Sequence, residues 1–191
     1  MPGEAPRLVL ASRSPQRRAI LESLGIDFDV RPADVVEEDD GPPATVAAEN
    51  ALRKAIAGKG QEGEVVLGVD TLVSTGIDLW GKPRDEEHAR ETLRRLSGWT
   101  HDVVSGVALR DHDGTVRAET ATTRVTFREL SDAVLDWYVA TGEWRERAGG
   151  YAIQGRGAAL VTRVEGDYLN VVGLPVPTLL GLWPDLLWRP V

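Results

Sequence analysis

Apolar positions along this 191-residue chain alternate between short continuous runs and helix-spaced faces. Residues 7–11 and 65–69 are mainly apolar runs of the kind found in buried strands that are covered on both faces. Between them, Ser14 is placed to cap a helix that begins at Pro15, and residues 45–57 carry apolar side chains at helical spacing. This alternation predicts a mixed α/β architecture.

The middle of the chain continues the pattern with a hairpin and two capped helices. Residues 103–109 and 116–127 are predicted strands, joined by a turn at residues 111–114. Asp85 and Ser131 stand at the expected starts of two further helices. We therefore expect a mixed central sheet that is flanked by helices.

The C-terminal part has a less regular pattern. We expect strands at residues 158–164 and 169–172, followed by a helix at residues 179–187 that Pro184 interrupts. No linker or repeat divides the chain, so a single domain over residues 1–191 is expected, with two lobes around a cleft left open as an arrangement.

Composition limits the classes of function. With 42% hydrophobic and 27% charged residues the chain has the composition of a folded protein, and its net charge of -8 argues against non-specific nucleic-acid binding. No apolar run approaches the roughly 20 residues that span a bilayer and no signal peptide is evident, so we expect a cytoplasmic protein without a membrane partner. Cysteine is absent and the three histidines lack metal-ligand spacing, so oxygen atoms would have to hold any metal.

The most informative local feature is a pair of arginines in the wrong place. Arg17 and Arg18 fall in the first turn of a predicted helix, where the helix dipole and free N–H groups favour negative charge. Together with Arg13 they would suit a phosphate group bound at the helix N-terminus. The alternative is that these side chains simply point into water.

Asp70 is the second candidate, because it follows the apolar run 65–69 and would stand at a strand terminus. Ligands of open α/β sheets usually bind beyond such termini, although an aspartate there can also cap a turn. The acidic residues 37–40 offer further oxygen ligands, or else form a solvated loop.

Two more polar residues have a functional and a structural interpretation. Lys82, between a glycine and a proline, is either a phosphate contact or a surface lysine. Gln154 can hydrogen-bond a base edge or pair with backbone. The motifs of P-loop hydrolases, dinucleotide-binding proteins, serine esterases and zinc proteases are absent, so those classes lack support.

Taken together, six motifs resemble the Maf family, the septum-formation-associated nucleoside triphosphate pyrophosphatases related in fold to inosine triphosphate pyrophosphatases. In chain order the motifs are 10–18 (LASRSPQRR), 69–71 (VDT), 81–83 (GKP), 96–98 (LSG) followed by His101, 148–155 (AGGYAIQG) and 170–175 (NVVGLP). The resemblance spans nearly the whole chain. It implies hydrolysis of nucleoside triphosphates to monophosphate and pyrophosphate.

The resemblance also implies roles for individual residues. Asp70 is the implied catalytic acid-base residue, and Glu37 and Asp70 are implied to lie near a divalent cation, Mg²⁺ or Mn²⁺. Four residues are implied to lie near the triphosphate: Ser12, Arg17, Lys54 and Lys82.

Base specificity is implied to depend on a second set of positions. Thr71 and Gln154 resemble those of the branch that acts on dTTP and UTP. The resemblance therefore favours dTTP and UTP as substrates. Gln16 stands where that branch commonly has arginine, so a broader or different base preference remains an alternative.

Two other functions remain as alternatives from sequence. One is a regulatory nucleotide-binding module in cell division, although a binding-only site has no need of a carboxylate beside the α-phosphate. The other is a phosphatase that releases orthophosphate. A homodimer is also left open, because Trp183 and Trp188 fit either the core or a subunit contact.

Overall fold

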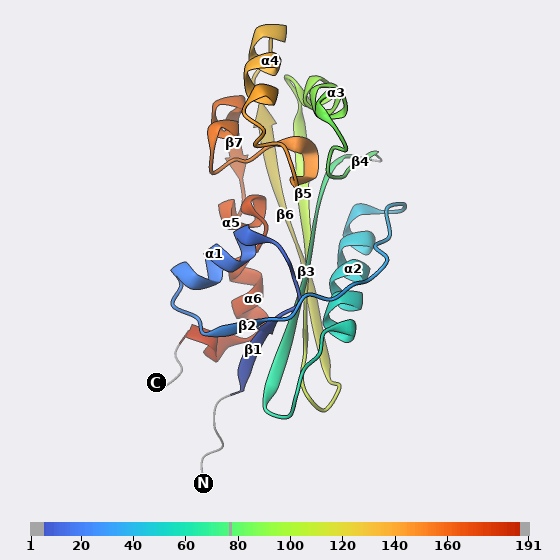
Figure 1. The fold of residues 1–191 in the computed structure, drawn as a ribbon, viewed down its shortest axis with the longest axis vertical. Helices are drawn as coiled ribbons and strands as arrows, with labels where there is room; N and C mark the ends of the chain where they lie inside the picture. The colour runs from blue at the N-terminus through green and yellow to red at the C-terminus, as the bar shows by residue number, and fades with distance from the viewer. Residues whose placement is uncertain (1–5, 77, 188–191) are drawn as a thin grey trace.

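The computed structural model describes residues 6–76 and 78–187, and its centre is a mixed seven-stranded sheet (Figure 1). The strand order is β2-β1-β3-β5-β6-β7, with β4 paired to the far end of β3. β1 runs parallel to β2 and β3, whereas the other pairs are antiparallel. The strands are β1 (Arg7–Leu10), β2 (Phe28–Val30), β3 (Glu64–Thr75), β4 (Asp78–Trp80), β5 (Thr100–Arg110), β6 (Val116–Phe127) and β7 (Val161–Glu165).

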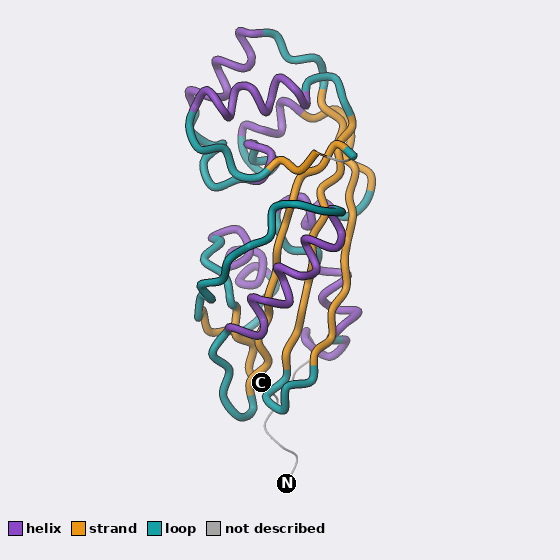
Figure 2. Tube along the Cα trace, turned by 90° about the vertical axis from the view of Figure 1, so that its right-hand side faces the viewer, coloured by secondary structure: helices purple, strands orange, loops and turns teal. Residues whose placement is uncertain are grey.

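Helices flank this sheet on both sides, as the hydrophobic pattern predicted. They are α1 (Pro15–Ser23), α2 (Pro43–Ala57), α3 (Glu86–Leu96), α4 (Asp132–Ala140), α5 (Tyr168–Val172) and α6 (Val176–Leu182), with short 3₁₀ turns η1 (Ala148–Gly150), η2 (Arg156–Leu160) and η3 (Pro184–Leu187). Figure 1 shows α1, α5 and α6 on one side of the lower half of the sheet, and Figure 2 shows α2 lying along the other side. α3 and α4 lie at the upper end, so the long strands β3, β5 and β6 join two groups of helices.

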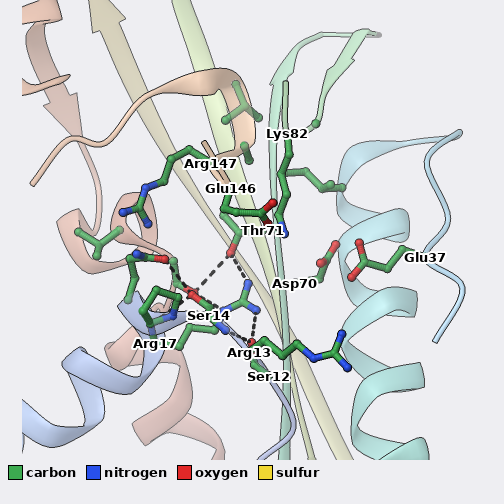
Figure 3. A pocket seen from close by; sticks show the side chains of 18 of the residues that line it. Ser12, Arg13, Ser14, Arg17, Glu37, Asp70, Thr71, Lys82, Glu146 and Arg147 are labelled. Atoms are coloured by element: carbon green, nitrogen blue, oxygen red, sulfur yellow. Dashed lines mark hydrogen bonds and ion pairs between the residues drawn. The ribbon is translucent and has the colours of Figure 1, made fainter. Parts of the chain in front are cut away.

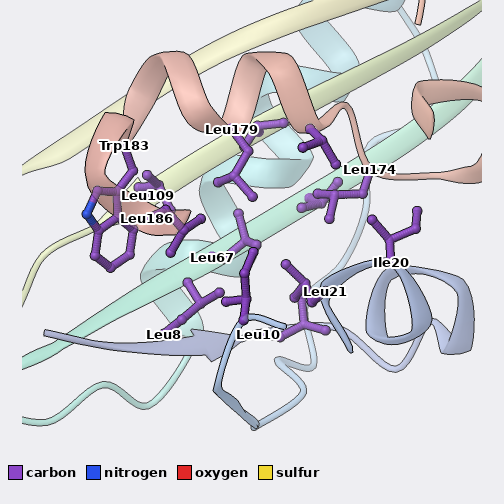
Figure 4. Close-up of a cluster of buried hydrophobic side chains, with 14 of the residues drawn as sticks. Leu8, Leu10, Ile20, Leu21, Leu67, Leu109, Leu174, Leu179, Trp183 and Leu186 are labelled. Carbon is purple, nitrogen blue, oxygen red and sulfur yellow. The ribbon is translucent and has the colours of Figure 1, made fainter. Parts of the chain in front are cut away.

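Each group of helices covers its own hydrophobic cluster. In the lower cluster, α1 and α6 pack on alternate residues of the strands, such as Leu8, Leu67 and Leu109 (Figure 4). Trp183 belongs to this cluster and is 9% exposed, so it is a core residue, whereas Trp188 lies outside the described residues. The upper cluster forms between α3, α4 and the far ends of the strands. No helix in the described part of the chain has both the length and the apolar character needed to cross a membrane.

Two expected strands have a different structure. Residues 169–172 form helix α5, because Asp167 caps it by accepting a hydrogen bond from the Leu169 amide (2.8 Å). Asn170 then faces inward and donates to the Val103 carbonyl (3.0 Å), a tertiary contact that a strand prediction from local β-branched residues does not include. Residues 158–160 belong to η2, and only residues 161–165 form a strand.

The position of Asp70 also differs from the prediction. Asp70 is in the middle of β3 and not at its terminus, because β3 remains paired to β5 from Val66 to Ser74. Its other neighbour, β1, is already finished at Leu10, opposite Leu67. The strand edge next to Asp70 is therefore open although the strand itself continues.

Helix α2 lies unusually close to the sheet because two glycines face it. A methyl group added to Gly68 or Gly106 would collide with the α2 backbone, at Ala51 and Ala47 respectively. We expect Gly106→Ala to lower the free energy of unfolding by at least about 1–3 kcal/mol, the usual cost of overpacking a core. Urea denaturation measures this change. Gly181→Ala is the matched control: it lies in α6 with no heavy atom within 4 Å of the added methyl, so equal losses in both variants would contradict the packing argument.

Candidate active site

One cleft contains every site residue that the family resemblance implied. It has a volume of about 1000 Å³ and lies where the open edge of β3 meets the loop after β1, the acidic loop before α2 and the segment before η1. The predicted residues that line it are Ser12, Gln16, Arg17, Glu37, Lys54, Asp70, Thr71, Lys82 and Gln154. Figure 3 shows how several of these side chains converge from separate elements.

The centre of the cleft is a buried cation between two carboxylates. The Lys54 ammonium lies 2.6 Å from Asp70 Oδ1 and 2.6 Å from Glu37 Oε1. Asp70 and Lys54 are only 5% and 7% exposed, whereas Glu37 is half exposed. Because buried charges are costly unless they are paired and hydrogen-bonded, Lys54 and Asp70 must stay together while the cleft is free of ligand, and Glu37 joins them from the surface.

Asn50 completes this centre, although sequence reasoning did not identify it. Its Nδ2 donates to Asp70 Oδ2 (3.1 Å) and to the Glu38 carbonyl (2.9 Å), and its Oδ1 accepts from the Glu38 amide (2.8 Å). Asn50 therefore fixes the catalytic candidate and the acidic loop to α2 at the same time. A signal was present, because Asn50 and Lys54 are i,i+4 neighbours on the alanine-rich inner face of that helix.

Arg17 lies on the opposite face of β3. Successive strand residues point to opposite faces, so Asp70 faces α2 while Thr71 faces α1. The Arg17 guanidinium donates to Thr71 Oγ1 (3.2 Å), Ser12 Oγ (2.9 Å) and the Gly173 carbonyl (2.9 Å). Burial lowers the pKa of Arg17, and the nearby charges of Asp70 and Glu37 oppose that change. Arginine nevertheless stays charged in proteins, so Arg17 places a fixed positive charge at the wall of the cleft.

The three arginines near the helix start thus have different environments. Arg17 enters the cleft and Ser14 caps the helix by accepting from the Arg17 amide. Arg18 points into solvent and pairs with Glu22 one turn later (2.7 Å). Arg13 lines the cleft and pairs with exposed Asp34 (2.8 Å). The solvent interpretation therefore holds for Arg18, whereas Arg13 and Arg17 line the cleft, where phosphate binding stays a prediction.

The remaining predicted residues lie on the walls. Lys82 is mostly exposed and pairs with Glu146 across the cleft mouth (2.8 Å), while Glu146 has a left-handed backbone (φ 58°) that is uncommon outside glycine. Gln16 accepts a hydrogen bond from Ser14 Oγ (3.1 Å), and Gln154 is exposed on the opposite wall. Arg147, which sequence reasoning did not single out, also lines the cleft.

A second layer of aromatic side chains supports the wall that carries Gln154. The rings of His101, Phe127 and Tyr151 meet edge to face, and a hydrogen bond of 2.9 Å joins His101 Nε2 to the Tyr151 hydroxyl. The Tyr138 hydroxyl accepts from the Ala152 amide (2.9 Å), and burial raises the pKa of Tyr138 to about 12. These contacts hold residues 151–153 against the upper cluster, so core packing sets the position of this wall.

The donor set for a metal ion is small. Within the described residues there is no group of three or more acidic or histidine side chains that could hold an ion. Glu37 and Asp70 are the two carboxylates that already converge on one cation, the Lys54 ammonium. Mg²⁺ is commonly held by one or two carboxylates together with substrate phosphates and water, so this pair fits such an ion only when a phosphate ligand is also present.

Comparisons with known proteins show which family the chain resembles in sequence. The model of the family described as Maf-like protein matches residues 7–185. The dTTP/UTP pyrophosphatase of Anaeromyxobacter dehalogenans (strain 2CP-C) is 49% identical over 177 residues, 90% of each chain. Those of Pyrococcus furiosus and Thermus thermophilus are 43% and 45% identical, covering 92% and 93% of this chain and 93% of their own.

Two solved structures are similar over a smaller part of the chain. The nucleoside-triphosphatase / dITP/XTP pyrophosphatase of Mycobacterium abscessus covers 63% of this chain and 74% of its own, with 21% identity and a TM-score of 0.40. The Staphylococcus aureus Ham1 protein covers 63% and 71%, with 16% identity and a TM-score of 0.45.

The aromatic wall makes a prediction about pH. Burial lowers the pKa of His101 from 6.5 to about 4, so the unfolded chain takes up the proton first as pH falls. The contribution of the neutral His101 ring to the free energy of unfolding is fully present above pH 6.5. It is lost as the pH falls from 6.5 to 4, by about 3 kcal/mol in total. We expect His101→Gln to remove this part of the pH dependence in urea denaturation at about pH 7 and about pH 4.5. A His101→Gln variant that keeps the slope of the unaltered protein would contradict the assignment.

Proposed function

This chain belongs to the Maf-like protein family, and we propose that it hydrolyses nucleoside triphosphates, with dTTP and UTP preferred, to the monophosphate and pyrophosphate. Relatives that are 43% to 49% identical over about nine-tenths of the chain carry the name dTTP/UTP pyrophosphatase. The observation that supports the proposal most is the buried Asp70–Lys54 pair, which lies in a cleft that also contains Arg17 and Ser12. A carboxylate beside so many phosphate-binding groups suits hydrolysis better than binding alone.

The cations of the cleft account for binding of the triphosphate. Lys54, Lys82 and Arg13 each have a carboxylate partner in the absence of substrate, and phosphate oxygens can replace those partners one for one. Arg17 and Ser12 are already bonded to each other, so they would add a fixed positive field and a hydroxyl without rearrangement. Such preorganised charges stabilise the negative charge that develops on departing pyrophosphate.

Asp70 is the proposed base. Asn50 and Lys54 hold its two oxygens in fixed positions, so the carboxylate cannot rotate freely. When Lys54 moves its hydrogen bond to a phosphate oxygen, Asp70 Oδ1 becomes free to accept a proton from water that attacks the α-phosphorus. The phosphorus–oxygen bond to the β-phosphate then breaks, and pyrophosphate leaves.

A divalent cation is part of the same proposal. Glu37 and Asp70 would hold Mg²⁺ or Mn²⁺ together with phosphate oxygens, and the ion would polarise the phosphate and neutralise its charge. The partner of the protein is then a nucleoside triphosphate, and neither nucleic acid nor a membrane is required. Whether two copies associate is a separate proposal that does not affect this chemistry.

The first test separates this function from both alternatives. A panel of ribo- and deoxynucleoside triphosphates with Mg²⁺ or Mn²⁺ should yield pyrophosphate and not orthophosphate, with the fastest turnover for dTTP and UTP. Asp70→Asn should lower kcat by about 100- to 10,000-fold, the range for loss of a general base. Asp39→Asn, an exposed change in the acidic loop, is the control. Orthophosphate release would favour a phosphatase, and an inactive natural protein that still binds nucleotides would favour the binding module.

A second test concerns the cation. Glu37→Gln should raise the Mg²⁺ concentration needed for half-maximal rate by about 10- to 100-fold, since a disturbed ligand set weakens metal sites by this amount. The neighbouring Glu38→Gln removes a carboxylate that pairs with Arg53 and does not contact Lys54, so it should leave the metal requirement unchanged. Full activity of the natural protein in excess chelator would refute metal dependence.

A further inference from the structure

Arg147 differs from the other cations of the cleft because its side chain has no partner in the described part of the chain. Its Nε is buried and donates no hydrogen bond to any described residue. The guanidinium forms no ion pair or hydrogen bond with any residue from 6 to 76 or from 78 to 187. Burial lowers the pKa of Arg147, which reflects the cost of keeping this charge in a partly desolvated place. An unpaired buried donor costs free energy, so Arg147 is prepared for an acceptor that these residues do not supply.

The position of Arg147 indicates which part of a ligand it meets. In Figure 3, Arg147 lies on the side of the cleft away from Asp70 and Glu37, where the proposed phosphate chemistry takes place. The same cleft also has apolar lining residues: Tyr151 and Ile153 belong to the upper cluster, and Val171 and Val172 pack against that cluster. Apolar side chains do not favour binding of a triphosphate, but they do favour binding of the flat faces of a nucleobase.

We propose that Arg147 determines base specificity by donating hydrogen bonds to a carbonyl oxygen of the pyrimidine ring. This inference rests on the proposed function of the cleft and deepens it. A guanidinium is donor-only, so it favours bases that present carbonyl oxygens to it. Uracil and thymine carry carbonyls at both C2 and C4, whereas cytosine has an amino group at C4 and adenine has no carbonyl.

Gln154 is suited to bind the ring nitrogen next to that carbonyl oxygen. Its amide oxygen can accept from the N3–H of uracil or thymine, a donor that cytosine lacks at this position. Gln16, by contrast, already uses its amide oxygen to accept from Ser14 Oγ (3.1 Å). Both residues line the cleft, and a carbonyl acceptor for Arg147 next to a ring N–H for Gln154 would distinguish uracil and thymine from cytosine and adenine.

The test compares binding of UTP and CTP without turnover. In the Asp70→Asn background, calorimetry with each nucleotide should show that Arg147→Met weakens UTP binding by about 10- to 100-fold, the loss expected for a charge-assisted hydrogen bond, and changes CTP binding by less than about threefold. In the active protein the KM for UTP and dTTP should rise while kcat changes little. Arg145→Met is the matched control, because Arg145 stacks on Trp144 and pairs with Glu86 outside the cleft.

Other outcomes overturn the inference. Equal losses for UTP, CTP and inorganic triphosphate would assign Arg147 to phosphate binding, and no loss for UTP would remove it from the site. If Arg147→Met lowers the melting temperature, Arg147→Lys is the deciding variant, because it retains a donor. It should recover part of the preference for UTP over CTP that Arg147→Met loses. The same ratio of UTP to CTP affinity in the Lys and Met variants would refute the inference. Failure of the proposed function is distinct, because it appears as absence of pyrophosphate release in the natural protein while the binding comparison can still be made.

Discussion

The ion pair between Lys54 and Asp70 is the interaction on which the rest of the site depends. Two charges this deeply buried are unfavourable unless their geometry is fixed and their remaining hydrogen-bonding capacity is used. Asn50 and Glu37 meet that condition, and both depend on the distance of α2 from the sheet. That distance is short only because Gly68 and Gly106 face the helix. Core packing and site chemistry therefore both constrain the position of α2, since this helix carries Lys54 and packs on Gly68 and Gly106.

The alternation of β3 divides the cleft into two functional sides. Asp70 faces α2, where the carboxylates and Lys54 lie, and Thr71 faces α1, where Arg17 lies. Asp70 and Thr71 are neighbours in sequence, so the acidic centre and the Arg17 charge lie on opposite faces of one strand. The open edge left by the short strand β1 gives a ligand access to both sides.

Much of this arrangement could be predicted from sequence, and the errors have identifiable physical causes. Arg17 was correctly placed because a cation at a helix start violates a local rule and so requires a tertiary explanation. Asp70 was wrongly expected at a strand end, because polar residues after it interrupt the apolar run although pairing with β5 continues. Helix α5 was missed since its cap and the inward contact of Asn170 are stronger than the β-branched preference of so short a segment.

The residues that the sequence could not reveal are those whose role depends on which other residues surround them in the fold. In the sequence, Arg147 looks like any of the chain's other arginines. It is distinguished only in the structure, where it lies in a partly buried wall and its side chain has no partner among the described residues. Lys54, Lys82 and Arg13 are neutralised by acids from separate elements, so the ligand-free site is balanced at those positions. Binding of an anionic ligand to those cations is an exchange of partners, which limits the net gain from each contact. Arg147 gives up no partner from the described part of the chain, so a new hydrogen bond there contributes more to selectivity than an exchanged one.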